Sequence, residues 1–105
     1  MSQILQQQSC VTIVEEEIHL TLPELCQACS TSQDYVMDWV YEGVLEPTGE
    51  APQDWRFTGQ SMRRARLACS LTRDLELNSP GIALVLDLLD KIATLESKLK
   101  RVAAR

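Results

Sequence analysis

The apolar positions that follow residue 20 predict a short amphipathic helix. Thr21 and Glu24 stand three residues apart, as in a capping box, and Pro23 is tolerated in a first helical turn. Apolar side chains then recur at spacings of three and four, which places them on one face: Leu22, Leu25, Cys26 and Cys29. Upstream, β-branched residues within positions 10–20 favour extended backbone, which we expect to form an edge strand.

A second short helix follows the polar residues 30–32, which end the first helix and supply caps for the next. Its apolar stripe consists of Val36, Trp39 and Val40, and Gly43 is typical of a C-terminal stop. Because only about seven residues separate the two stripes, the pair predicts a helix-turn-helix with Trp39 in the core.

The middle of the chain predicts a loop, a wing and a third helix. Proline and glycine make residues 46–54 a loop, and Trp55 and Phe57 alternate in a segment expected to pair with the early strand and anchor the wing. The third helix begins at Thr58 or Ser61 and ends near residues 76–78. Its apolar face consists of Ala65, Ala68, Leu71 and Leu75.

The last helix has the clearest pattern in the chain. Ser79 suits its N-cap and Pro80 its first helical position. Apolar residues then fill the a and d positions of a heptad repeat: Val85, Leu88, Ile92, Leu95, Leu99 and Val102. Four more widen the stripe in the first half only: Ile82, Leu84, Leu86 and Leu89. We therefore expect burial on two sides in the first half and a narrow seam in the second half.

A helix of this length protrudes from a small globule, so we expect its seam to pair with a second copy. The expected dimer contacts are Ile82, Val85, Leu88, Leu89, Ile92, Leu95, Leu99 and Val102. The direction of pairing stays open. An antiparallel pair brings Lys91 and Lys98 near like charges, whereas a parallel pair matches Lys91 with Glu96.

Composition predicts one folded domain. The 105 residues are 45% hydrophobic and 24% charged, which is ordinary for a globular protein. No apolar run approaches the roughly 20 residues of a membrane span, and the polar start does not resemble a signal peptide, so we expect a cytoplasmic protein. The expected organisation is a disordered tail over 1–9, a winged helix-turn-helix over 10–78 and a dimerisation helix over 79–105.

The charges are segregated between the two halves of the chain. Residues 1–55 contain ten acids and no lysine or arginine, whereas residues 56–105 contain all ten basic residues and five acids. The halves carry −10 and +5, which sum to the net charge of −5. Because long-range fields steer encounters, the acidic half is expected to avoid nucleic acid and to attract a basic protein.

No residue pattern predicts catalysis or a cofactor. The cysteines are Cys10, Cys26, Cys29 and Cys69, of which the second and third form a C-x-x-C. With one histidine and no second cysteine pair, a zinc site is hard to complete, so buried core thiols are favoured over metal or redox chemistry. Neither a glycine-rich phosphate loop nor a supported Ser/His/Asp set is present in the sequence, and we expect no enzyme and no metal.

Several segments resemble one protein family. They are residues 20–26 (LTLPELC), 42–47 (EGVLEP), 55–57 (WRF), 66–78 (RLACSLTRDLELN) and 80–90 (PGIALVLDLLD). Over roughly residues 11–102 the chain is similar to the CbpM family of chaperone modulatory proteins. The resemblance implies a mainly α-helical, MerR-like winged helix-turn-helix with a small β-wing and a long C-terminal dimerisation helix. It also implies that the protein binds the J-domain of a CbpA/DnaJ-like co-chaperone and uses no cofactor. The bound co-chaperone would then stimulate DnaK less and bind the nucleoid less.

The second helix is the candidate binding element. Asp34, Asp38 and Glu42 are spaced by four and form one acidic ridge, which would repel DNA phosphates and complement the basic J-domain helix that the resemblance implies. Nearby aromatic and apolar residues supply a hydrophobic centre. The predicted partner site is Asp34, Tyr35, Met37, Asp38, Tyr41 and Glu42. A merely solvated acidic face is the alternative interpretation.

A basic cluster on the third helix supports the alternative function of a small MerR-like DNA-binding regulator. The cluster consists of Arg63, Arg64, Arg66 and Arg73. In one interpretation, Arg63, Arg64 and Arg66 contact DNA phosphates. In the favoured one, the cluster pairs with the chain's own acids. A third possible function is that of a purely structural dimer scaffold.

Overall fold

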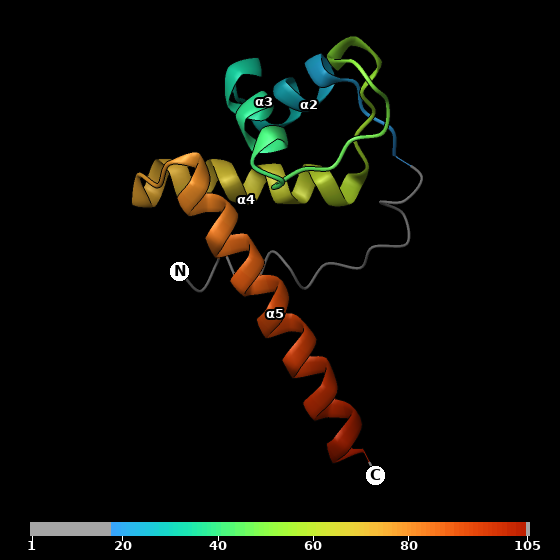
Figure 1. The fold of residues 1–105 in the computed structure, drawn as a ribbon, viewed down its shortest axis with the longest axis vertical. Helices are drawn as coiled ribbons and strands as arrows, with labels where there is room; N and C mark the ends of the chain where they lie inside the picture. The colour runs from blue at the N-terminus through green and yellow to red at the C-terminus, as the bar shows by residue number, and fades with distance from the viewer. Residues whose placement is uncertain (1–17, 105) are drawn as a thin grey trace.

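The computed structural model describes residues 18–104, in which four α-helices and one short 3₁₀-helix follow each other. They are α2 (Leu22–Cys29), α3 (Gln33–Tyr41), η3 (Pro52–Asp54), α4 (Gly59–Leu75) and α5 (Ser79–Ala103). Helices α2 and α3 lie on one side of α4, and α5 turns back beneath α4 and extends away from the globule (Figure 1). The predicted order of helices is thus confirmed. The predicted tail over 1–9 and most of the predicted strand lie outside the described residues.

Local capping sets the ends of the first two helices. The Glu24 N–H donates to the Thr21 hydroxyl at 3.3 Å and the Thr21 N–H donates to the Glu24 carboxylate at 2.9 Å, which confirms the capping box. Ser32 caps α3 by accepting from the Tyr35 N–H at 3.4 Å. Gly43 follows the C-cap of α3 with a φ of +80°, a conformation that favours glycine, and the helix ends there as predicted.

The later helices begin at side-chain caps as well. Thr58 is the N-cap of α4 and accepts from the Ser61 N–H at 3.2 Å. For α5 the predicted cap is displaced by one residue, because the Asn78 side chain accepts from the Gly81 N–H at 2.9 Å. Asparagine and serine are both favoured N-caps, so local preference alone could not separate residues 78 and 79. The 25 residues of α5 span about 37 Å.

In place of the predicted small β-wing, the described residues contain two isolated antiparallel bridges and no strand. Leu20 and Phe57 exchange backbone hydrogen bonds of 2.8 and 2.7 Å, and Thr48 and Arg56 exchange bonds of 3.1 and 3.0 Å. Within residues 18–104 these one-residue bridges stand where the sequence predicted a small β-wing. The prolines at 47 and 52 lack an N–H to donate, and η3 occupies the loop, so a longer ladder cannot form here.

The core lies where α2, α3, α4 and the first half of α5 meet. Trp39 is 1% exposed, as predicted, and Phe57 is fully buried with its ring edge-to-face against Trp55 at a centroid distance of 6.1 Å. The core contains Leu22, Leu25, Val36, Trp39, Val44, Leu45, Trp55, Phe57, Ala65, Leu67, Ala68, Leu71, Ile82, Leu86 and Leu89. None of the helices in the described part is long and apolar enough to cross a bilayer.

Two residues that were expected at a dimer interface belong to this core. Ile82 is 1% and Leu89 is 8% exposed, because α3 and α4 pack against the face of α5 that carries them. Val85 is partly buried against the same core. The contacts expected with a second copy at Ile82 and Leu89 are therefore replaced by contacts within the protomer.

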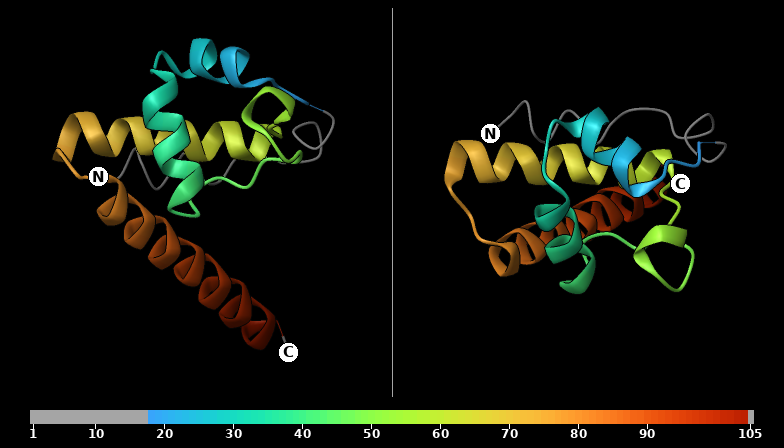
Figure 2. Two further views of the ribbon diagram at one scale, coloured as in Figure 1. Left: turned by 45° about the horizontal axis from the view of Figure 1, so that its top comes forward. Right: turned by 90° about the horizontal axis from the view of Figure 1, so that it is seen from above.

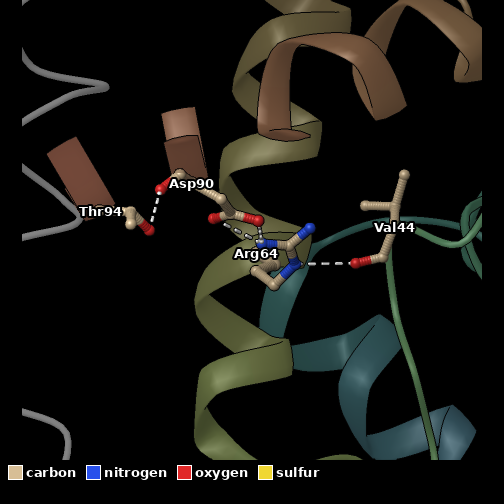
Figure 3. A network of polar contacts seen from close by, with 4 residues as sticks. All are labelled: Val44, Arg64, Asp90 and Thr94. Carbon is tan, nitrogen blue, oxygen red and sulfur yellow. Dashed lines mark hydrogen bonds and ion pairs between the residues drawn. The ribbon is translucent and has the colours of Figure 1, made fainter. Parts of the chain in front are cut away.

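Arg64 connects α5 to the rest of the globule. Its Nε donates to the Val44 carbonyl at 2.8 Å, and its Nη1 donates to both carboxylate oxygens of Asp90 at 3.0 and 3.2 Å (Figure 3). The Thr94 hydroxyl donates to the Asp90 carbonyl one turn further along α5 at 3.0 Å. A residue of α4 thereby holds both the loop after α3 and the place where α5 leaves the globule.

We expect Arg64→Met to lower the free energy of unfolding by about 1–2 kcal/mol, because it leaves a carbonyl and a carboxylate without their charged donor. The matched control is Arg73→Met, which removes an ion pair with Asp74 whose side chains are 71% and 51% exposed. Its expected loss is under about 0.5 kcal/mol. Urea unfolding of both variants measures the difference, and equal losses would contradict the connecting role of Arg64.

Candidate functional site

The outward face of α3 carries five of the six residues predicted to bind a partner. All five are exposed, and the tyrosines at 35 and 41 are 48% and 71% exposed. We call this surface the acidic face; it consists of Asp34, Tyr35, Asp38, Tyr41 and Glu42. It faces outward because the opposite side of α3 is held in the core by Val36 and Trp39. The predicted spacing thus produces one continuous exposed surface.

Met37, the sixth predicted contact, lies apart from this face. It is partly buried and packs against the core, since its position on the helix places it beside Val36 and Val40. The aromatic surface of the acidic face is supplied by the tyrosines instead. The ring of Tyr35 lies 6.1 Å from that of buried Trp39, which restricts its orientation.

The acidic face carries uncompensated negative charge. Residues 18–55 contain no lysine or arginine. Over the described range 18–104, the ion pairs use Asp74, Asp87 and Asp90, and none uses a carboxylate of α3. Exposed carboxylates that form no ion pair among residues 18–104 set a local negative potential, which attracts cations and repels phosphates.

The arginine cluster of α4 is partly occupied by contacts within the chain. Arg64 is held by Val44 and Asp90, and Arg73 pairs with Asp74 at 3.1 Å. Arg66 is exposed on the same helix. These contacts favour the interpretation that the arginines pair with acids of the same chain. They weigh against a phosphate-binding surface.

The described cysteines are half-buried thiols. Cys26 and Cys29 of α2 and Cys69 of α4 pack against the core, and burial raises the pKa of all three, that of Cys29 to about 11. The Cys69 thiol donates to the Cys29 carbonyl at 3.6 Å. Among residues 18–104, no group of three or more His, Cys, Asp or Glu residues is placed to hold a metal ion. Cys10 lies outside the described residues.

A second exposed surface runs along α5. The part of α5 beyond residue 89 is exposed on all sides and extends from the globule (Figure 2). We call its apolar stripe the seam; its side chains are 47–68% exposed, and they are Leu84, Leu88, Ile92, Leu95, Leu99 and Val102. Leu84 was not among the expected dimer contacts. Its position one turn before Leu88, on the face opposite Ile82 and Leu86, would have indicated it.

A cleft of about 660 Å³ lies where α3, α4 and α5 converge. Its walls come from the end of α3 and the following loop, from the first two turns of α4, and from α5. Four carboxylates line it, namely those of Glu42, Glu46, Asp87 and Asp90, and Arg64 is the basic residue in its wall. We call it the acidic cleft. Glu42 belongs both to the acidic face and to the acidic cleft.

Comparison with known proteins agrees with this fold. Residues 20–103 match the MerR HTH family regulatory proteins, the class that the helix-turn-helix and the long last helix define. The chain is 42% identical over 88 residues to the chaperone modulatory protein CbpM of Coxiella burnetii (strain Dugway 5J108-111), covering 84% of this chain and 83% of that protein. It is 38% identical over 81 residues to CbpM of Pseudomonas putida (strain W619), covering 77% of this chain and 80% of that protein.

Within the MerR-like class, the chain belongs to the CbpM family of chaperone modulatory proteins. Both family names denote non-enzymatic kinds of protein. The acidic face and the seam are therefore candidate binding surfaces.

Cys29 provides a test of how tightly α2 packs on α4. With a pKa of about 11, about one Cys29 thiol in a thousand is ionised at pH 8, so iodoacetamide should react slowly. We expect the rate at Cys29 to rise about tenfold per pH unit from pH 7 to 10, followed by peptide mass spectrometry. In urea the thiol should ionise near its ordinary value of 9.0. A rate that already levels off near pH 9 in the folded protein would contradict this packing.

Proposed function

We propose that this protein binds the J-domain of a CbpA/DnaJ-like co-chaperone through its acidic face and inhibits the action of that co-chaperone on DnaK. The observation that carries the proposal is the acidic face itself, an exposed helix surface with three carboxylates and no cation nearby in sequence. Membership of a family of chaperone modulatory proteins supports it. Inhibition follows from occlusion, since the covered basic surface is the one that DnaK would use.

The chemistry of the acidic face suits a basic helix of a protein partner. Opposite potentials raise the rate of encounter and fix the register of the complex. Tyr35 and Tyr41 flank the carboxylates, and exposed aromatic rings of this kind supply the desolvated centre from which most binding energy comes. The complex would form in the cytoplasm and would also withdraw the co-chaperone from the nucleoid.

DNA binding through α3 is disfavoured by the same charges. A recognition helix contacts phosphates and base edges with arginine, lysine or amide side chains. Here each phosphate would meet Asp34, Asp38 or Glu42. Arg64, which the alternative function requires as a phosphate contact, is already bonded to Val44 and Asp90.

The protein is further proposed to act as a homodimer that buries the seam of α5. The seam is an unbroken apolar stripe of about 27 Å on a helix that leaves the globule. A contiguous apolar surface of this kind marks an interaction site, and its heptad spacing suits a second α-helix. The proposed contacts are Leu84, Val85, Leu88, Ile92, Leu95, Leu99 and Val102.

Reversal of charge on the acidic face tests J-domain binding. We expect Asp34→Lys combined with Asp38→Lys to weaken binding to the cognate J-domain about tenfold or more at low salt, because both attraction and steering are lost. The matched control is Glu50→Lys with Asp54→Lys, which changes net charge equally on the exposed loop before α4. Titration calorimetry measures both. Unchanged affinity in the α3 variant, or equal losses in both variants, would remove the acidic face from the binding site.

Disruption of the seam tests the dimer. Leu95→Asp places a charge at the middle of the seam and should yield monomers with unchanged helix content, because residue 95 makes no core contact in the protomer. Ser97→Asp adds the same charge at an exposed position on the face of α5 opposite the seam and should leave the dimer intact. Sedimentation velocity and circular dichroism distinguish the cases. A Leu95→Asp variant that stays dimeric would contradict the proposed interface.

A further inference from the structure

Glu42 is the last residue of the acidic face, and its position depends on the loop that follows it. Asp34 and Asp38 lie within α3, whose backbone holds them, whereas Glu42 is the C-cap. Its N–H donates to the Asp38 carbonyl at 2.9 Å, and Gly43 comes next with a φ of +80°. Helix ends fray, because their last carbonyl groups lack partners within the helix. Glu42 therefore needs support from outside α3 to stay aligned with the other two carboxylates.

The loop after Glu42 is restrained weakly on one side. A Cβ at Gly43 would meet no other part of the described structure within 4 Å, so packing does not restrain this joint. Val44 and Leu45 are buried, and their N–H groups donate to the Trp39 carbonyl at 2.8 and 3.4 Å. The second of these bonds is long. The peptide between Val44 and Leu45 is thus held loosely through its N–H.

Arg64 holds the carbonyl side of the same peptide and connects it to α5. Its Nε donates to the Val44 carbonyl at 2.8 Å, and its Nη1 donates to both carboxylate oxygens of Asp90 (Figure 3). Because the guanidinium is planar, bonds to two partners fix its orientation. Asp90 directly follows Leu89, which is buried in the core, so the far end of the bridge is firmly placed.

The charge of Arg64 acts in the opposite direction from its geometry. Arg64 is the basic residue in the wall of the acidic cleft, which the carboxylate of Glu42 also lines. Loss of this positive charge would make the potential beside the acidic face more negative. Electrostatic steering alone would then raise the affinity for a basic helix. A role in positioning and a role as a charge therefore predict opposite changes in affinity when Arg64 is neutralised.

We infer that Arg64 is a positioning residue of the partner site: through Val44 and Asp90 it holds Glu42 in line with the other two carboxylates of the acidic face. The inference rests on the proposed function and deepens it, since Arg64 acts on partner binding through another residue. It makes the third carboxylate of the acidic face depend on α5, because Asp90 belongs to that helix.

Substitution of Arg64 separates position from charge. We expect Arg64→Met to weaken J-domain binding about fivefold at low salt, although the variant is more negative. Arg64→Lys keeps the charge but lacks the planar fork, so we expect a loss of about threefold. Thr21→Ala removes the capping box of α2 and should leave affinity unchanged. Titration calorimetry measures all three. Undiminished binding by either Arg64 variant, or an equal loss in Thr21→Ala, would overturn the inference.

A double-mutant cycle distinguishes positioning of Glu42 from general loosening of the fold. In a Glu42→Gln background, Arg64→Met should weaken binding by less than about twofold, because the carboxylate that it positions is already gone. In an Asp34→Asn background, Arg64→Met should keep its effect of about fivefold. Both backgrounds remove one carboxylate of the acidic face, so their net charges are equal. Equal effects of Arg64→Met in the two backgrounds would contradict the inference.

Amide hydrogen exchange of the free protein tests the bridge without the partner. We expect Arg64→Met to speed exchange at Gly43 and Val44 about fivefold and to leave the amides of α2 unchanged. Unchanged exchange at these two amides would overturn the inference while the proposed function stands. The proposed function would also stand if charge reversal on α3 abolished binding and the Arg64 effects were additive. A wild-type protein that does not bind the J-domain would overturn both.

Discussion

Helix α5 carries more apolar surface than its own globule covers, and the rest of the structure depends on how that surface is divided. In the first half of α5, one side is buried by α3 and α4 through Ile82, Leu86 and Leu89. The opposite side remains exposed from Leu84 to Val102. Arg64 of α4 bonds Asp90, the residue that directly follows Leu89, the last buried residue of α5. Because α3 packs on the buried side of α5, it does not cover the seam.

Local rules predicted the helix starts and the helix-turn-helix core well. Thr21, Thr58 and Gly43 act through neighbours within a few residues, so sequence spacing is sufficient to identify them. Spacing could not show that Ile82 and Leu89 belong to the core of the protomer. The first half of α5 is apolar on both sides, and only tertiary packing decides which side faces inward. The acidic cleft was not predicted for a similar reason: Arg64 and Asp90 are separated by 26 positions in sequence.

The candidate site shows the same limit within a single helix. A spacing of four placed Asp34, Asp38 and Glu42 on one face, and the structure exposes all three. Met37 could not be placed by spacing alone, since a residue at the edge of a helix stripe is covered or exposed according to what packs beside it, and here the core reaches it. The charge of the surface was thus predictable from sequence, while its apolar contribution required the packing of α3.

The position of α5 relative to α3 has a consequence for avidity. Because α5 extends away from the globule (Figure 1), pairing along its protruding half would leave α3 of each copy uncovered. The assembled protein would then be bivalent, with two equivalent docking helices held at a set separation by a rigid rod. A ligand that itself carries two basic modules would meet the second docking helix at a high effective concentration, and its release would require both to detach together.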